Sequence, residues 1–331
     1  MAPASRDDVS IAPFDIEGIF PDAGRPAVGV DAVRLPRRQE GSAQELAITL
    51  VADYTLLRRS WLPSAALVAL LTELGVSTAA ARTVISRLSR RGLLDGSRDG
   101  RRTLYRLPGP VAAHLAHAGR WIAAFAAGPD PWDGTWTLLA FSLPKEETRQ
   151  RRRLRGQLRW LGFAPLFDGL WVSPRHLDAD GEERLRAVAG GATALFRARH
   201  LGRDWPTDRE PLAAWDLGLI AQSYADFLGI WTPVSDRVRR GEVGGIDAVR
   251  FRTEVMDTYR LLPVLDPRLP AELLPSDWPR HRAREVFVAV YDGLARAAET
   301  HVRAVATAWG ADLPGLRAHT VEQMAAGLGY E

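Results

Sequence analysis

Between Ser77 and Arg90 the sequence combines an apolar stripe with arginine and hydroxyl side chains at helical spacing. The stripe consists of Ala81, Val84, Ile85 and Leu88. Its intervals of three and four residues predict an amphipathic helix with that face buried. The open faces then carry Arg82, Thr83, Ser86, Arg87 and Arg90. Arginine can bind O6 and N7 of guanine together, and serine can reach a base or a phosphate, so this pattern favours a helix that reads DNA in the major groove.

Hydroxyl groups stand at the beginning of the same helix. Ser77 is a preferred N-cap residue, and its position marks the helix start. We expect Ser77, Thr78 and Thr83 near DNA phosphates, because the free N–H groups of a helix N-terminus attract anions. The alternative for each arginine of the helix is an ordinary solvated charge on an exposed face.

A basic hairpin follows the helix. Gly92 can end the helix in a left-handed conformation, and Asp99-Gly100 is a strong turn signal between two short strands expected at residues 93–97 and 103–107. The arginines at the hairpin tip are Arg98, Arg101 and Arg102. We expect them to contact the DNA backbone or minor groove. Residues 82–106 hold eight arginines and two aspartates, a local charge of +6.

Two further helices are expected ahead of this stretch, at residues 44–57 and 63–74. Three helices and a two-stranded wing predict a winged helix-turn-helix DNA-binding domain over residues 42–110. Residues 1–41 contain five prolines and no sustained period, which indicates a flexible N-terminal tail. Residues 111–130 hold a connecting helix, expected to run from 109 to 127. We interpret its His114 and His117 as surface or packing residues, because no further metal ligands stand near them in the sequence.

Residues 131–203 have a different pattern. An apolar strand is expected at 136–143, then a helix, two short strands within 164–174, a helix at 181–188 and a strand at 193–200. The order β-α-β-β-α-β predicts a ferredoxin-like middle domain. Its first helix carries arginines between residues 149 and 159. They could contact DNA, bind the phosphates of a coenzyme A ester, or form a solvated face.

From residue 204 to 331 the pattern is mostly helical. Helices are expected around 217–231, at 246–262 and at 284–309. A proline-punctuated loop at 263–279 is either a functional lid or a structural brace. Together the three regions predict an α+β protein: an N-terminal winged helix-turn-helix, a ferredoxin-like middle domain and a mostly helical C-terminal domain.

Composition sets further bounds. The chain has 331 residues and a net charge of only +3, so the clustering of charge carries more weight than its total. It has no cysteine, which excludes disulfides and thiolate catalysis. It has no apolar run of the roughly 18 residues that a membrane span needs. We therefore expect a cytoplasmic protein with no membrane contact, no cofactor and no metal.

Three stretches resemble the PaaX-type transcriptional repressors of phenylacetate degradation. The first is the DNA-binding region, with Ala52-Asp53-Tyr54 and LGVSTAAARTVISRLSRRGLL. The second runs from Trp132 to Pro174, with WDGTWTLLAFSLPKE and LRWLGFAPLFDGLWVSP. The third is YRLLPVLDPRLPAELLPSDWP, from Tyr259 to Pro279. The resemblance implies a three-domain homodimer that binds double-stranded promoter DNA and is released by phenylacetyl-CoA.

The resemblance also implies a middle domain similar to the small nucleases of CRISPR adaptation. Those proteins place an aspartate at the end of their first strand, where this chain has Phe141-Ser142-Leu143. A nuclease is therefore disfavoured. Ahead of the Asp-Pro of the third stretch stand Leu261, Leu262, Pro263 and Val264 in place of aromatic residues. The effector could accordingly be phenylacetyl-CoA, another acyl-CoA or a related aromatic metabolite.

The function that these features favour is that of a ligand-responsive DNA-binding regulator, a dimeric repressor and not an enzyme. Its paired winged domains would bind half-sites separated by roughly 34 Å or a multiple. Its small-molecule effector is expected in a cleft between the middle and C-terminal domains. The alternative is a metal-dependent nuclease or a thioester-acting enzyme that uses the ferredoxin-like domain. A DNA-binding protein that senses no ligand is a third possibility.

Overall fold

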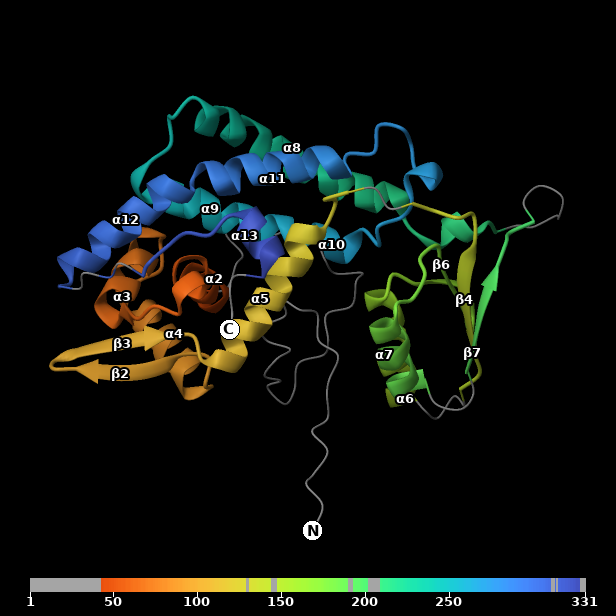
Figure 1. The fold of residues 1–331 in the computed structure, drawn as a ribbon, viewed down its shortest axis with the longest axis horizontal. Coiled ribbons are helices and arrows are strands. Elements are labelled where there is room, and N and C mark those ends of the chain that lie inside the picture. Colours follow the sequence, from red (N-terminus) through yellow and green to blue (C-terminus); the bar gives the residue numbers. More distant parts are fainter. Residues whose placement is uncertain are drawn as a thin grey trace, which may run out of the picture. The chain divides into compact units, whose positions relative to one another are not determined.

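The structure, a computed structural model, describes residues 43–128, 131–143, 148–189, 193–201, 209–310, 313 and 315–327 (Figure 1). The N-terminal tail expected at 1–41 lies outside these ranges. The described residues form two compact units. Of the described residues, the larger one draws on those within 43–127, 223–261 and 280–327, and the smaller one on those within 128–222 and 262–279. The winged domain and most of the C-terminal helices thus belong to one compact unit.

The larger unit begins with the winged domain. Its elements are α2 (Ala43–Thr55), η2 (Leu56–Arg58), β1 (Leu62–Pro63), α3 (Ser64–Glu73), α4 (Thr78–Arg90), β2 (Asp95–Asp99) and β3 (Arg102–Arg106). The three strands form an antiparallel sheet in the order β1-β3-β2. Leucines on the inner faces of α2 and α3, such as Leu50, Leu67 and Leu70, are fully buried, as the apolar pattern predicts.

The first wing strand begins and ends later than the sequence pattern predicts, and the second begins and ends earlier. We expected strands at 93–97 and 103–107, but Leu93, Leu94 and Leu107 are buried in the domain core and lie outside the hairpin. Burial of these leucines shifts both strands toward the turn. Asp99 pairs with Arg102, so the loop contains only two residues, and Gly100 has the positive φ of 58° that such a turn requires.

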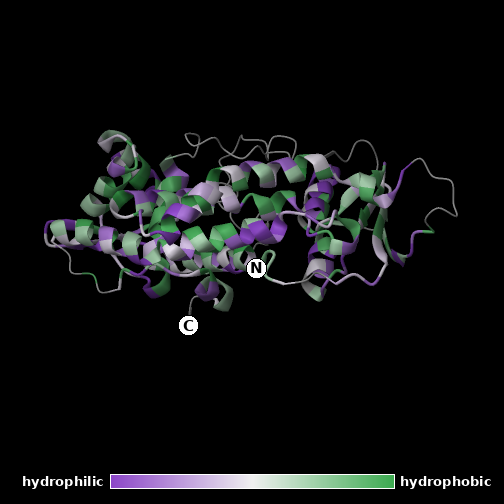
Figure 2. Ribbon diagram, turned by 90° about the horizontal axis from the view of Figure 1, so that it is seen from above, coloured by the Kyte–Doolittle hydropathy of each residue, from purple (hydrophilic) through white to green (hydrophobic). Residues whose placement is uncertain are grey.

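Helices complete the larger unit. They are α5 (Gly109–Ala124), the part of α8 (Leu217–Arg239) from residue 223 onward, α9 (Gly245–Tyr259), α11 (Arg280–Gly293), α12 (Ala295–Ala308) and α13 (Val321–Ala326). Most carry apolar residues along one side and hydrophilic residues along the other (Figure 2). Aromatic rings fill the centre, where Tyr259 stacks on Phe287 with ring centroids 4.0 Å apart.

The prediction of a single helix at 284–309 is wrong, because the chain forms α11 and α12, and Leu294 between them belongs to neither helix. A Cβ on Gly293 would lie 2.7 Å from Val238 Cγ1 of α8. Leu294 is buried at the break. The close approach of α8 leaves no room for a side chain at the last residue of α11.

The smaller unit contains β4 (Trp136–Phe141), α6 (Thr148–Trp160), β5 (Ala164–Phe167), β6 (Leu170–Ser173), α7 (Ala179–Ala189) and β7 (Thr193–Ala198). The sheet order is β5-β6-β4-β7 with every neighbouring pair antiparallel. This is the ferredoxin-like order that the sequence predicts. One face of the sheet packs against leucines of α6 and α7, including Leu154, Leu158 and Leu185.

The proline-rich segment packs on the same unit. It contains α10 (Leu262–Leu265) and η5 (Ala271–Leu273). Leu273 packs against the cluster of Trp136, Leu166 and Val172. Asp266 is buried and accepts hydrogen bonds from Trp278 Nε1 at 3.3 Å and from the Arg268 N–H at 2.8 Å. Of the two alternatives for this loop, these contacts favour the brace.

Candidate nucleic-acid interface

The helix α4 presents the side chains that the sequence singled out. Ala81, Ile85 and Leu88 are buried, and Val84 is half-buried. The predicted DNA-contacting residues of α4 are exposed, and they are Thr78, Arg82, Thr83, Ser86, Arg87 and Arg90. Because the apolar stripe fixes the rotation of α4 on α2 and α3, its polar residues share one continuous open face.

Two hydroxyl groups of this region are already engaged with the backbone. Ser77 caps α4, and its Oγ accepts a hydrogen bond from the Ala80 N–H at 3.3 Å. The Ser77 O–H proton remains available to a phosphate oxygen. Thr83 Oγ1 donates to the Ala79 carbonyl at 2.9 Å. Since a phosphate can only accept, Ser77 is the better phosphate ligand of the two.

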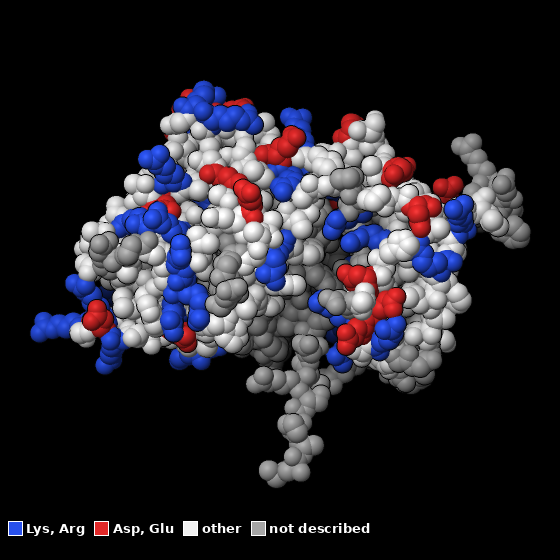
Figure 3. Space-filling view, viewed as in Figure 1, with Lys and Arg blue, Asp and Glu red and all other residues white. Residues whose placement is uncertain are grey.

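The wing separates its arginines into two groups. Arg98 and Arg101 are exposed at the hairpin end, from which arginine side chains project in Figure 3. Arg102 is exposed as well, but its Nη1 donates to the Gly310 carbonyl just beyond α12. Arg106 lies over the Trp61 ring at 4.3 Å and 3.8 Å from an Asp95 oxygen. Arg102 and Arg106 therefore stabilise the position of the wing.

Three arginines of the basic helix α6 have partners within the smaller unit. Arg151 donates to the Leu143 carbonyl, Arg155 pairs with Asp168 at 3.3 Å, and the Arg159 guanidinium lies 5.7 Å from the centre of the Trp171 ring. These contacts support a structural role for much of the helix. Within the described ranges, no group of three acidic, histidine or cysteine side chains is placed to hold a metal ion.

A second polar cluster of the smaller unit surrounds Asp133. Its carboxylate accepts from the Thr135 hydroxyl at 2.7 Å, the Thr135 N–H at 2.9 Å and Arg197 at 2.9 Å, and His176 lies 3.2 Å away. The hydrogen bonds from Thr135, then the Arg197 charge, lower the pKa of Asp133 to about 2. A carboxylate with this many donors ties β7 to the loop before β4 and has a structural role.

Sequence reasoning did not find a buried polar cluster that joins α2 to the C-terminal helices. Asp53 of α2 accepts a hydrogen bond from the Tyr291 hydroxyl at 2.7 Å, and His319 Nε2 lies 3.0 Å from the same hydroxyl. Because that hydroxyl donates to Asp53, His319 must donate its Nε2–H to the tyrosine oxygen. Arg252 of α9 lies over the Tyr291 ring at 3.5 Å and donates to the Tyr291 and His319 carbonyls.

Burial shifts the pKa values of Asp53 and His319 in this cluster. Desolvation raises the pKa of Asp53 to about 6, against a smaller opposing effect of Arg252, whose Nε is 3.7 Å from Asp53 Oδ2. Desolvation, with a further contribution from Arg252, lowers the pKa of His319 to about 3. Asp53 is therefore largely ionised and His319 neutral at pH 7. The three partners of Asp53 lie about 200 to 270 positions along the chain from it, so no local pattern signals the cluster.

Comparisons with known proteins agree with this architecture. Residues 42–110 match the family model "PaaX-like protein", residues 129–209 the "PaaX protein central Cas2-like domain", and residues 215–304 the "PaaX-like protein C-terminal domain". The chain is 30% identical over 246 residues to the transcriptional repressor PaaX of Escherichia coli strain K12, covering 72% of this chain and 75% of that protein.

A solved structure shares the fold. An uncharacterized protein from Mycobacterium tuberculosis superimposes with a TM-score of 0.57 at 22% sequence identity. The match covers 78% of this chain and 98% of the other. Over the residues that the structure describes, no helix is both long and apolar enough to cross a lipid bilayer.

Proposed function

This chain belongs to the PaaX family of transcriptional regulators, and on that premise we propose that it is a repressor that binds double-stranded promoter DNA through α4 and the wing. The family is one of regulators, not enzymes. The observation that carries the proposal is the open face of α4. Its arginines are exposed because the buried apolar stripe occupies the opposite side of the helix, and the wing that follows carries the exposed Arg98 and Arg101.

The roles of the individual residues follow from their surroundings. Arg82, Ser86 and Arg90 are spaced by four residues on the open face, which suits contacts to successive bases in the major groove. Ser77, at the start of α4, suits a phosphate. Arg98 and Arg101 suit the backbone or minor groove beside the wing.

An alanine substitution tests the assignment. Duplexes are first selected from a random pool on the purified wild-type chain, and binding is then measured by fluorescence anisotropy. We expect Arg82→Ala to weaken binding by about 1–3 kcal/mol, which is roughly five- to 150-fold. Arg282→Ala is the matched control, because Arg282 is an exposed arginine of α11 outside the interface. Equal binding by all three proteins would refute the role of α4.

We also propose that the repressor is a homodimer. In the described part of the smaller unit, β7 is an edge strand, and on it Leu195 and Phe196 are 42% and 52% exposed. An apolar edge strand is a ready surface for pairing with a second copy. Sedimentation equilibrium should give a dimer for the wild type and a monomer for Phe196→Glu. A wild-type monomer at tens of micromolar would contradict this proposal.

Release by an acyl-CoA is the last part of the proposal. Phenylacetyl-CoA is the first compound to try, followed by other acyl-CoA thioesters, with free coenzyme A as the control. A ligand of the native state raises the unfolding temperature. The effector should therefore raise it while weakening binding to the selected duplex. An acyl-CoA that does neither is not the effector.

A further inference from the structure

Trp309, at the end of α12, is a large apolar residue that is 50% exposed. The buried stripe of α12 consists of Ala298, Val302 and Ala306. Trp309 follows Ala306 by three residues, so it continues this stripe past the last turn of the helix. The apolar stripe of α12 therefore reaches the surface of the larger unit at this end.

The last turn of α12 fixes the backbone of Trp309. The Trp309 N–H donates to the Ala306 carbonyl at 3.2 Å, and the Gly310 N–H donates to the Thr307 carbonyl at 2.8 Å. Gly310 then leaves the helix with a positive φ of 78°. Because this backbone is fixed and a tryptophan side chain has only two torsions, ordering the ring against a partner costs little entropy.

The tip of the wing touches this end of α12. Arg102 begins β3 directly after the tip, and its Nη1 donates to the Gly310 carbonyl. A Cβ on Gly310 would collide with the Arg102 guanidinium, so this close approach requires glycine. Figure 1 shows the end of α12 and the wing on the same side of the larger unit. Trp309 is thus the neighbour of a residue that contacts the wing, whose exposed Arg98 and Arg101 stand at the tip.

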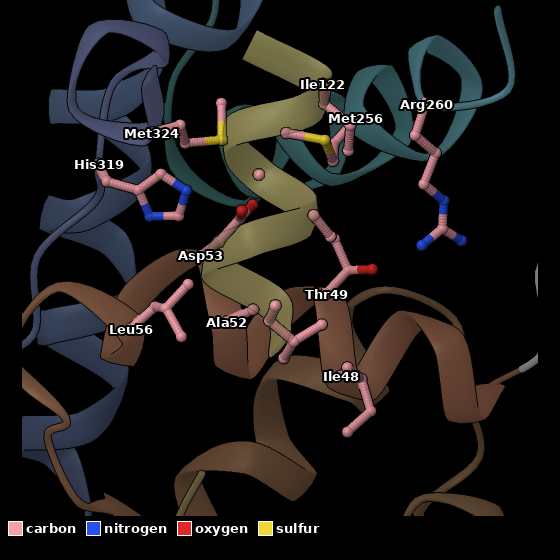
Figure 4. A pocket seen from close by; sticks show the side chains of 13 residues that line it. Ile48, Thr49, Ala52, Asp53, Leu56, Ile122, Met256, Arg260, His319 and Met324 are labelled. Atoms are coloured by element: carbon pink, nitrogen blue, oxygen red, sulfur yellow. The ribbon is translucent and has the colours of Figure 1, made fainter. Parts of the chain in front are cut away.

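The segment that leads into α13 fixes the end of α12 relative to the winged domain. The Arg317 N–H donates to the Tyr54 carbonyl of α2 at 3.0 Å, and the Arg317 guanidinium pairs with Glu299 of α12 at 2.8 Å. His319 of the same segment lies beside Asp53 of α2, as Figure 4 shows. The end of α12 therefore has a defined position beside the winged domain.

The charges at this end of α12 favour a polyanion but keep its phosphates off the helix end itself. Residues 300–310 contain no aspartate or glutamate, and Arg98 and Arg101 are exposed at the wing tip. The last carbonyls of a helix carry a partial negative charge, which repels a phosphate. Arg102 offsets this charge only at Gly310. The neutral ring of Trp309 therefore suits the sugars between the phosphates of DNA.

We propose that Trp309 belongs to the DNA interface and that its exposed ring packs against deoxyribose at the minor groove beside the wing. This inference rests on the proposed function, in which Arg98 and Arg101 contact the backbone or minor groove. Apolar side chains at the minor groove are a known device of DNA-binding proteins, and sugar contacts position a protein without reading bases. Trp309 thus adds affinity for DNA and extends the interface from the winged domain to α12.

Substitutions in the full chain test this contact by fluorescence anisotropy on the selected duplex. Trp309→Ala should weaken binding by about fivefold to tenfold. Trp309→Phe keeps a flat apolar ring and should bind within about threefold of the wild type. Ile230→Ala is the matched control, because Ile230 is a 40% exposed apolar residue of α8 in the same unit. Binding by Trp309→Ala equal to that of the wild type would overturn the proposal.

The salt dependence of binding separates a direct ring contact from displacement of the wing. Trp309 carries no charge, so Trp309→Ala should weaken binding while the slope of log affinity against log salt stays unchanged. If the substitution acted by moving Arg98 and Arg101 away from the DNA, the slope would fall by about one for each arginine. A slope reduced in this way would overturn the direct contact.

A hydroxyl-radical footprint locates the contact, because the radicals attack deoxyribose in the minor groove. Trp309→Ala should lose protection of the sugars beside the wing and keep protection over the α4 contact. Full protection in both places would refute the inference about Trp309 alone, whereas a wild type that protects no duplex would refute the proposed function as well. Sedimentation equilibrium without DNA should give the same mass for Trp309→Ala and the wild type. A smaller mass for the variant would assign the ring to a contact between copies and overturn the proposal.

Discussion

Replacing Asp53 with asparagine should change the pH dependence of stability in a direction that the buried cluster fixes. Asparagine keeps the size of the side chain and an acceptor for the Tyr291 hydroxyl, but it removes the titrating group. Burial raises the pKa of Asp53 from 3.8 to about 6, although Arg252 opposes the change from 3.7 Å. Asp257 raises it slightly, and the Tyr291 hydrogen bond lowers it. Desolvation prevails because Arg252 Nε is too far from Oδ2 to hydrogen-bond.

The magnitude follows from the linkage between proton binding and folding. Below pH 3.8 the carboxyl group is protonated in both the folded and the unfolded chain. Between pH 3.8 and about 6 the folded chain retains a proton that the unfolded chain has lost, so the free energy of unfolding falls as pH rises. Each pKa unit corresponds to about 1.36 kcal/mol. The full effect is therefore about 3 kcal/mol, of which the wild type should lose about 2 kcal/mol relative to Asp53→Asn between pH 4 and pH 7.

The assay is urea unfolding of both proteins at several pH values. Hydrogen exchange of the α9 and α11 segments is the readout, so that only unfolding of the larger unit is observed. Other titrating groups cancel in the difference between the two proteins. His319→Gln should show the opposite sign, because the pKa of His319 is lowered from 6.5 to about 3 and its neutral form gains stability as pH rises through that range. A difference that is flat with pH, or one that grows in favour of the wild type at high pH, would refute the reasoning for Asp53.

Other contacts lead to further predictions. Thr83→Val should leave affinity for the selected duplex within about twofold, since the hydroxyl proton is bound to a backbone carbonyl one turn earlier; a loss of tenfold would show that the hydroxyl turns to DNA. Arg101→Ala should lower the salt dependence of binding by about one unit, whereas Arg102→Ala should leave it unchanged because the guanidinium is held by the Gly310 carbonyl; equal slopes for the two variants would contradict that division. Gly293→Ala should lower the unfolding temperature, because the new Cβ would stand 2.7 Å from a valine methyl of α8. Overpacking of this kind costs about 1–3 kcal/mol. A variant as stable as the wild type would show that α8 can move away at little cost in free energy.

The parts of the fold that local patterns govern could be predicted from the sequence. The apolar stripe of α4 lies where its three- and four-residue intervals place it, and Ser77 caps the helix. The order of the ferredoxin-like sheet also follows from the order of its elements. Each of these depends on periods and caps within about a dozen residues, which one sequence displays directly.

The features that escaped prediction depend on contacts between distant segments. The break after Gly293 lies where α8 leaves no room for a side chain. The wing strands are shifted because Leu93, Leu94 and Leu107 are buried in the domain core. Arg102 has a partner more than 200 residues away, at Gly310, and Asp53 meets Tyr291 across a similar interval. Such pairs have no local signature, so the helix that presents the DNA-binding residues was predictable and the cluster behind it was not.

The most direct test of the central claim, that α4 reads DNA, is a hydroxyl-radical footprint of the full chain on the selected duplex. The wild type should protect two half-sites whose centres are roughly 34 Å or a multiple apart. Replacement of Arg82, Arg87 and Arg90 together with alanine should abolish the protection while leaving the unfolding temperature unchanged, because all three side chains are exposed. A footprint that persists in this folded triple variant would contradict the account.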